Sequence, residues 1–287
     1  MPTTWELDFY SRPLLDETGK KRWEVVICES PSDVQADLEQ SFRYSQFFSS
    51  KAVNSLSLKE ALTAAIAQAG QPPTQLRFFR RQMNNMIVKA CQDLGIPAKP
   101  SRRTVALSSW LDYRYAQVYP QQEGYQETAT STVKYSQERP VALPDALRGE
   151  SWRVVSLESA AFNDLAEWEI DFGEAFALTG MGLEPSQPIP GLLIYSARAK
   201  ALAAWMSGLD LAFLTLDEGD RPALVLETGM SDRWLLAALT KPERLAEIQQ
   251  FEQAKQAANK IHFIGVQQTP ESERFEGFWL LRQLALG

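Results

Sequence analysis

The first thirty residues alternate between apolar and polar positions in two separate runs. The runs at residues 5–16 and 21–30 are rich in aromatic and β-branched residues, and the polar residues 17–20 between them are typical of a turn. We therefore expect the chain to begin with an antiparallel β-hairpin.

Apolar residues then recur at helical spacing over most of the first half of the chain. Ser32 precedes one such pattern, and Ser57 with Glu60 forms a box-like start to another, which stops at Gly70. Pro120 is expected to end the last of them. The expected helices are residues 32–49, 57–69, 81–95 and 105–119, with a short strand at residues 76–79.

The composition changes between residues 121 and 146, where the sequence is polar and has few large apolar residues. Such a segment is typical of a linker. Patterned sequence then resumes and predicts strands at residues 150–159, 168–176, 191–196, 260–268 and 275–284, a hairpin at 211–228, and helices at 197–209 and 242–260.

Strands and helices are mixed in both halves, which predicts an α/β (mixed α+β) protein. The length of 287 residues suits two domains better than one core. We expect an N-terminal α/β domain over residues 1–120, a polar linker over 121–146 and an acidic C-terminal α/β domain over 147–287.

Several sequence features bear on where the protein works. No apolar run approaches the roughly 18 residues that span a bilayer, so no integral membrane segment is expected. The first residues lack the basic and apolar regions of a secretory signal. Cys28 and Cys91 are too few for a disulfide framework. Together these features predict a cytoplasmic protein.

The single histidine limits the chemistry that the chain can perform. His262 lies in a strand-like run, where a packing role is expected. A zinc site needs about four cysteine or histidine ligands, and a serine–histidine or cysteine–histidine mechanism would depend on this one residue. The glycine-rich motifs of nucleotide-binding loops are missing. We therefore expect no catalytic residue, no metal ligand, no cofactor and no enzymatic activity.

Positive charge is concentrated in one segment of an acidic chain. Residues 77–114 carry a net charge of +6, whereas the whole chain has −7. A protein that repels polyanions overall yet gathers cations in one segment has a candidate phosphate-binding surface. The alternative is a solvated helix face followed by a basic loop.

Five segments of the chain carry a resemblance to a known family. They are WELDFYSRP at residues 5–13, WEVVIC at 23–28, FFRRQMNNMI at 78–87, PSRRT at 100–104 and FWLL at 278–281. Together they resemble the Tab-two-like family of cyanobacterial and chloroplast proteins, described as RNA-binding translation activators for photosystem reaction-centre subunits. The resemblance covers both halves of the chain.

The resemblance implies a role in photosystem biogenesis, and so in photosynthesis, through translation regulation. It implies binding to A/U-rich single-stranded leader RNA of photosystem messages, an N-terminal and a C-terminal domain, and a location peripheral to thylakoid membranes. The lack of a transit peptide fits a cyanobacterial member of the family. It implies no particular RNA-binding residue.

The candidate RNA-binding residues therefore come from the chemistry of the basic segment. Single-stranded RNA is bound by cations that follow its phosphates and by aromatic rings that stack on its bases. Aromatic residues are interleaved with the cations here, although Phe78, Phe79 and Trp110 also suit a core. The candidates are Arg77, Arg80, Arg81, Asn84, Lys89, Lys99, Arg102 and Arg103, with Arg12 in the first hairpin as a further one.

A metal-dependent nuclease is a second hypothesis. A hairpin carrying Asp8, a helix carrying Glu60 and then a strand, a helix and a strand follow a ribonuclease H-like order. That chemistry needs three or four carboxylates around two metal ions. Arg80 and Arg81 stand where the next carboxylate would follow the strand, so the catalytic set is incomplete, and we expect binding without cleavage.

A third hypothesis is a protein-interaction or assembly factor for photosystem biogenesis. The acidic C-terminal half contains several tryptophans and could dock ribosomal or photosystem assembly proteins. Salt dependence separates the hypotheses, because binding through several phosphates weakens steeply with salt and binding through an apolar interface does not.

Overall fold

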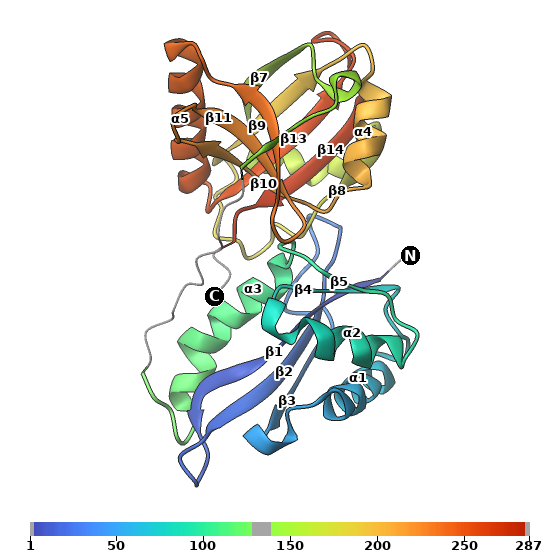
Figure 1. Ribbon diagram of the computed structural model, residues 1–287, viewed down its shortest axis with the longest axis vertical. Coiled ribbons are helices and arrows are strands. Elements are labelled where there is room, and N and C mark those ends of the chain that lie inside the picture. The colour runs from blue at the N-terminus through green and yellow to red at the C-terminus, as the bar shows by residue number, and fades with distance from the viewer. Residues whose placement is uncertain (1–2, 128–138, 285–287) are drawn as a thin grey trace. The chain divides into compact units, whose positions relative to one another are not determined.

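The computed structural model describes residues 3–127 and 139–284, and these form two compact units (Figure 1). Among the described residues, the first unit consists of 3–31 and 37–127, and the second of 32–36 and 139–284. The middle of the predicted linker, residues 128–138, lies outside the described residues, so the boundary at 121–146 stays a prediction. Within each unit the fold is mixed α/β, as predicted from the sequence.

The N-terminal unit is built on a five-stranded sheet with the order β3-β2-β1-β4-β5. β1, β2 and β3 pair antiparallel, whereas β4 runs parallel to β1 and β5 parallel to β4. The strands are β1 (Thr4–Leu15), β2 (Lys21–Glu29), β3 (Arg43–Phe48), β4 (Gln75–Phe78) and β5 (Ala98–Pro100).

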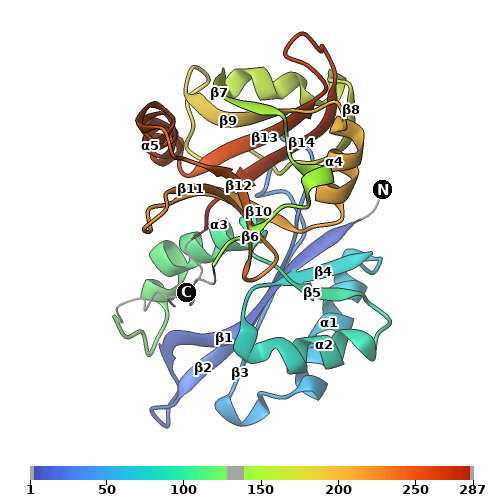
Figure 2. The same cartoon turned by 45° about the horizontal axis from the view of Figure 1, so that its top comes forward.

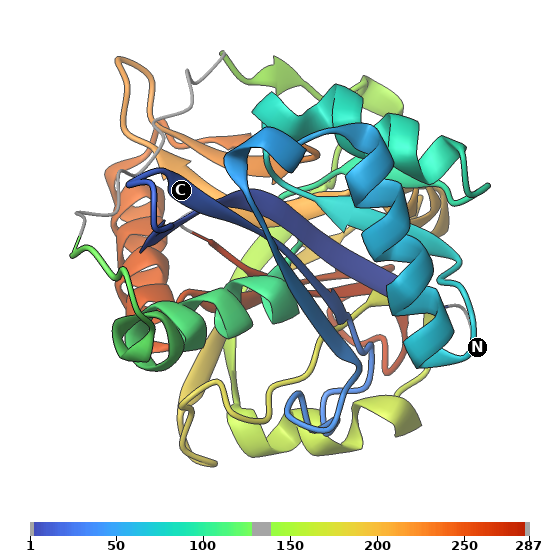
Figure 3. The same ribbon diagram turned by 90° about the horizontal axis from the view of Figure 1, so that it is seen from below.

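Helices cover both faces of this sheet. Figures 1 and 3 show α1 and α2 on one side of the strands and α3 on the other. The long helices are α1 (Ser55–Ala69), α2 (Asn84–Gln92) and α3 (Val105–Tyr113), and the short helical turns are η1 (Ser50–Ala52), η2 (Arg81–Met83), the π-helical η3 (Arg114–Val118) and η4 (Tyr119–Gln121).

The alternation of β1 divides its side chains between these two faces. Trp5, Leu7 and Phe9 are buried in the apolar core that includes residues of α1 and α2. Because successive side chains of a strand point to opposite faces, Glu6 and Asp8 must face the α3 side. The pattern WELDF thus gives one apolar face and one charged face that is also buried.

Most predicted elements of the first half are confirmed, but the helix at 32–49 is wrong. Residues 43–48 form the edge strand β3, which pairs with β2 from Trp23↔Phe48 onward. The residues before it form turns, in which the Asp33 and Asp37 carboxylates accept backbone N–H groups at 2.9 and 2.8 Å. These local bonds compete with a helix. The N-cap of α1 is Asn54 and not Ser57.

The C-terminal unit contains two sheets (Figure 2). The larger has the order β7-β9-β13-β14-β8 and the smaller β10-β11-β12-β6. The larger sheet consists of β7 (Ser151–Glu158), β8 (Ile170–Glu174), β9 (Pro188–Tyr195), β13 (Ile261–Gln267) and β14 (Phe275–Arg282). The smaller consists of β6 (Val141–Ala142), β10 (Leu211–Asp217), β11 (Ala223–Thr228) and β12 (Asp232–Ala238).

The helices of this unit pack on an apolar core that both sheets share. Residues of β9, β13, β14, β10 and β11 share one apolar cluster with α4 (Ala199–Ser207) and α5 (Pro242–Ala257). The 3₁₀ segments are η5 (Asp145–Leu147) and η6 (Ser159–Glu167), and Phe162 of η6 contacts Phe263 and Phe278 of the larger sheet. The predicted strands and helices of this half are confirmed; β12, β6 and η6 were not predicted.

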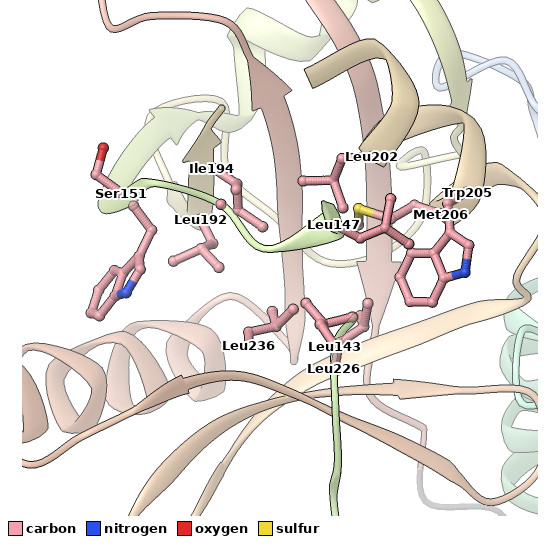
Figure 4. A pocket seen from close by; sticks show the side chains of 12 residues that line it. Leu143, Leu147, Ser151, Leu192, Ile194, Leu202, Trp205, Met206, Leu226 and Leu236 are labelled. Atoms are coloured by element: carbon pink, nitrogen blue, oxygen red, sulfur yellow. The ribbon is translucent and has the colours of Figure 1, made fainter. Parts of the chain in front are cut away.

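A small apolar cavity of about 20 Å³ lies in this core (Figure 4). Leu143 and Leu147, from the segment that contains η5, line it together with Leu202 and Met206 of α4 and Leu226 of β11. Leu143, in the stretch 121–146 that was predicted as a linker, thus packs onto the core of the unit, as does Leu147, the first residue of the predicted C-terminal domain.

His262 packs inside the C-terminal unit, as predicted. Its Nε2 accepts the backbone N–H of Leu214 at 2.9 Å, and the ammonium group of the buried Lys255 donates to the Leu214 carbonyl at 2.8 Å. Burial and the nearby Lys255 lower the pKa of His262 well below its usual value. The histidine thus fixes β10 against β13 in its neutral form.

Among the described residues, no helix combines the length and the apolar character needed to cross a membrane.

The packing of β9 against β13 predicts a sensitive position. A Cβ atom on Gly191 would lie 2.2 Å from ring carbons of Phe263. We expect Gly191→Ala to lower the free energy of unfolding of this unit by about 1–3 kcal/mol, because the ring must leave its position. Urea unfolding followed by circular dichroism measures this. The exposed control Gly219→Ala should change stability by less than about 0.5 kcal/mol, and equal stability of the two variants would contradict the packing.

A buried ion-pair cluster and the exposed cations beside it

Three carboxylates lie on the α3 face of the N-terminal sheet. Glu6 and Asp8 come from β1 and Glu24 from the neighbouring β2, and each is at most 1% exposed. Ionised carboxylates are buried in proteins only when cations or hydrogen-bond donors compensate the lost water. The partners of these three groups therefore define the chemistry of this face.

Asp8 is held by two arginines. Its Oδ2 accepts from Arg12 Nη1 at 2.8 Å and its Oδ1 from Arg80 Nε at 2.6 Å. The Arg80 guanidinium also lies over the ring of Tyr10, 3.7 Å from the centroid. Burial alone would raise the pKa of Asp8, but the two guanidinium groups outweigh it and lower that pKa. Asp8 is therefore an ion-paired carboxylate with both oxygens occupied.

Glu24 is the second carboxylate that arginines hold on this face of the sheet. Arg12 Nε donates to its Oε2 at 3.0 Å, so Arg12 bridges Asp8 and Glu24. Arg114 donates to the other oxygen, and the Tyr119 hydroxyl donates to Oε2 at 2.6 Å. Arg114 and Tyr119 both follow α3, in η3 and η4. The contacts therefore tie the end of that helical segment to β2.

We call Asp8, Arg12, Glu24, Arg80 and Arg114 the buried cluster. Three guanidinium groups surround two carboxylates, and every member is at most 7% exposed. A metal ion at Asp8 would have to displace cations that already neutralise it, and it would be repelled by them. Among residues 3–127 and 139–284, no group of three or more histidine, cysteine or acidic side chains could hold a metal ion.

Glu6 has a different partner. Its Oε2 accepts the backbone N–H of Leu107, in the first turn of α3, at 2.7 Å. A carboxylate there satisfies one of the free amide groups at a helix start and complements the helix dipole. Burial raises the pKa of Glu6 to about 7, against the opposing effects of the Leu107 amide, the Ser30 side chain, Arg77 and Arg103.

Four of the nine predicted RNA-binding residues lie in the interior. Arg12 and Arg80 belong to the buried cluster, and Arg77 and Arg103 flank Glu6; the four are 1–7% exposed. Lys89 and Arg81 are exposed, and Lys89 pairs with Asp93 at 2.6 Å on α2. Partly exposed are Asn84, Lys99 and Arg102.

The topology brings three of these residues to one edge of the sheet, the side on which the parallel strands β4 and β5 have their carboxyl ends. β4 and β5 are parallel, and Phe78 pairs with Pro100 at their carboxyl ends. Arg81 and Asn84 follow β4, and Arg102 follows β5. The crevice at the carboxyl ends of parallel strands is where open α/β sheets usually bind ligands. Lys89, on the body of α2, is not part of this edge.

The aromatic residues interleaved with these cations in the basic segment are mostly in the core. Phe78, Phe79 and Trp110 are buried, Tyr115 is partly buried, and Tyr113 on α3 is 56% exposed. The sequence did not predict Glu24, Arg114 and Tyr119 as partners. A signal was present in β1, where the charged residues Glu6, Asp8 and Arg12 lie on the face opposite the apolar one.

Fold and site together define an α/β protein with exposed and partly exposed cations where two parallel strands end, which suits an anionic ligand. Residues 4–114 match the domain described as "RNA-binding protein Tab2/Atab2 N terminal", and residues 130–282 match its C-terminal domain. The chain therefore belongs to the RNA-binding Tab2/Atab2 family, as its sequence motifs predicted.

Two curated relatives agree with this assignment. Both are named "Protein TAB2 homolog, chloroplastic", from Zea mays and Arabidopsis thaliana, and both are 37% identical over 98% of this chain. The chain covers 71% and 74% of their respective lengths.

A solved structure that is similar to part of the chain is a simian T-cell lymphotropic virus intasome in complex with PP2A regulatory subunit B56 gamma. The match covers 42% of each chain at 15% identity, with a TM-score of 0.28. A similarity at this level carries no argument about fold or function.

The position of Glu6 predicts a pH-dependent contribution to stability. Because its folded-state pKa of about 7 lies above the ordinary value of 4.5, protonation favours the folded chain. The contribution is fully present below pH 4.5 and is lost as the pH rises to about 7. Between pH 5 and pH 8, we expect the free energy of unfolding of the natural chain to fall by on the order of 2 kcal/mol more than that of Glu6→Gln. The amide oxygen of the glutamine can still accept from Leu107.

Urea unfolding at the two pH values measures this difference. The pKa of His262 is lowered in the folded chain, so its titration changes stability with pH in the opposite direction. Because His262 is present in both proteins, its effect cancels and the difference between them reports on Glu6. The exposed Glu17→Gln is the matched control and should follow the natural chain at both pH values. An unchanged pH dependence in Glu6→Gln would contradict the assignment.

Proposed function

We propose that this chain binds A/U-rich single-stranded leader RNA and activates translation of photosystem reaction-centre messages. The family description supports RNA binding, and the names of the chloroplastic relatives suit a photosynthetic context. In a cyanobacterial cell the protein would work in the cytoplasm, peripheral to the thylakoid membranes where such messages are translated.

The RNA-contacting surface that we propose is the open edge at the ends of β4 and β5. Arg81 and Arg102 supply cations for phosphates, and Asn84 supplies an amide that can bond base edges. Lys99 of β5 lies beside this edge and extends the positive surface. The observation that carries the proposal is this gathering of exposed and partly exposed cations in a family of RNA-binding proteins.

The buried arginines have a different role in this proposal. Arg12 and Arg80 neutralise Asp8 and Glu24 inside the unit, and Arg77 and Arg103 are buried near Glu6. A guanidinium that leaves a buried carboxylate to reach RNA would leave that charge uncompensated, which costs about 3–5 kcal/mol. We therefore assign these four residues to folding rather than to RNA contact.

We also propose that RNA is bound without being cleaved. The strand order β3-β2-β1-β4-β5, with Asp8 in the central strand, supports a ribonuclease H-like relationship. In such enzymes several carboxylates hold two metal ions. Here Arg12 and Arg80 occupy the oxygens of Asp8, and Glu60 is exposed on α1, which packs on the other face of the sheet.

The proposed edge predicts a selective loss of RNA binding. We expect Arg81→Glu combined with Arg102→Glu to weaken binding of a fluorescein-labelled A/U-rich single-stranded RNA, because two phosphate contacts become repulsive. The slope of log affinity against log salt should fall by about 1.4, since each contact with single-stranded nucleic acid contributes about 0.7. Fluorescence anisotropy over a salt series measures both quantities.

The matched control reverses two exposed cations of the C-terminal unit, Arg221→Glu with Lys241→Glu. It makes the same change in net charge and should leave the salt slope unchanged. Equal losses in both double variants would mean that net charge alone governs binding and would contradict the edge. The labelled RNA should stay intact with Mg²⁺ or Mn²⁺, and cleavage that disappears in Asp8→Asn would contradict binding without catalysis.

A further inference from the structure

A second candidate binding site lies in the C-terminal unit. A groove of about 740 Å³ opens where η6 ends and β14 begins. This volume is within the range of pockets that enclose a ligand group. The residues that matter for its chemistry are Glu167, Trp168, Glu169, Glu273, Phe275 and Glu276.

The groove is negatively charged. Four glutamates line it, against one arginine, Arg274. Arg274 is itself engaged by carboxylates, with Nη2 2.8 Å from Asp171 Oδ1 and Nε 3.6 Å from Glu276 Oε1. Glu167, Glu169 and Glu273 are exposed. The field in the groove therefore attracts a cation and repels a nucleic-acid phosphate.

Aromatic rings form part of the wall. Trp168 and Phe275 are stacked, with centroids 5.8 Å apart and an interplanar angle of 21°. Phe278 supports both rings from the sheet, at 5.3 Å from Trp168 and 5.2 Å from Phe275. Trp168 and Phe275 are partly exposed. A rigid, partly exposed tryptophan is the ring that best receives a guanidinium or ammonium group.

A buried carboxylate adds to the negative charge of the groove. Glu276 lines the groove and is 6% exposed, and its Oε1 lies 3.6 Å from Arg274 Nε. Its Oε2 is enclosed by the protein. Glu276 therefore acts on a ligand through its field, whereas Glu167, Glu169 and Glu273 are exposed and can contact one.

We propose that this groove binds an arginine- or lysine-rich segment of a partner protein. The cationic side chains would stack on Trp168 and pair with the exposed glutamates. The groove belongs to the C-terminal unit, whereas the RNA-binding edge proposed above belongs to the N-terminal unit and has the opposite charge. It gives the C-terminal unit a role that RNA binding does not supply, because it can hold a basic protein while the N-terminal unit holds RNA.

The test uses the full chain and a short fluorescein-labelled peptide of alternating arginine and glycine, with a glutamine-for-arginine peptide as the uncharged probe. The variant Glu167→Gln, Glu169→Gln, Glu273→Gln removes the exposed charges of the groove. We expect it to weaken binding of the arginine peptide by about tenfold or more in anisotropy titrations. Trp168→Leu should weaken it by about threefold, as loss of a cation–π contact predicts.

The matched control, Glu218→Gln, Asp220→Asn, Glu243→Gln, removes three exposed charges elsewhere in the same unit. It should change affinity by less than about twofold. Equal weakening by both triple variants, no binding of the arginine peptide, or equal binding of the glutamine peptide would each overturn the proposal.

RNA binding measured on the same preparations keeps the two proposals apart. The groove variants should bind RNA as the natural chain does, and the edge variant Arg81→Glu with Arg102→Glu should bind the peptide normally. Loss of RNA binding only in the edge variant and of peptide binding only in the groove variant is the result that supports both sites.

Discussion

The burial of Asp8 and Glu24 beneath α3 constrains the rest of the N-terminal unit. Two carboxylates on adjacent strands are fully enclosed, and Arg12, Arg80 and Arg114 reach them from β1, from the end of β4 and from the end of the α3 segment. Removing one partner of a buried ion pair costs about 3–5 kcal/mol. The cluster thus fixes where β4 ends and where α3 lies on the sheet.

The same constraint separates two kinds of arginine that the sequence cannot distinguish. Arg80 turns inward to Asp8, whereas Arg81, the next residue, is exposed. The basic segment therefore supplies both the counter-ions of a buried carboxylate pair and the cations of an exposed edge. In the C-terminal unit the charges are reversed, since a groove lined by glutamates and Trp168 suits a basic partner.

Much of the fold could be predicted from local patterns. The first hairpin, the helices before Gly70 and Gly95, and the strands and helices after residue 150 follow from alternation, helical spacing and stop signals. The structure of residues 32–49 could not be predicted in this way. Their apolar positions have helical spacing, but Asp33 and Asp37 form Asx turns and residues 43–48 pair with β2, which is a long-range contact. Tertiary pairing overrides local spacing in such cases.

The candidate site was less predictable than the fold. The distribution of charge along the sequence indicates the basic segment. Whether each arginine in it is buried depends on the strand face that it occupies and on partners far along the chain. Glu24 and Tyr119 are 95 residues apart and share a hydrogen bond. No spacing rule within the sequence connects them, and the inward direction of Arg77, Arg80 and Arg103 follows only once the sheet is assembled.

Comparison of Arg80→Met with Arg81→Met tests this account most directly, because the two residues are neighbours and are assigned opposite roles. Urea unfolding should place Arg80→Met about 3 kcal/mol below the natural chain, with the RNA salt slope of the folded protein unchanged. Arg81→Met should stay within about 0.5 kcal/mol in stability and lose about 0.7 from the salt slope. The reverse pattern, a stable Arg80→Met that fails to bind RNA beside an Arg81→Met that binds normally, would contradict the account.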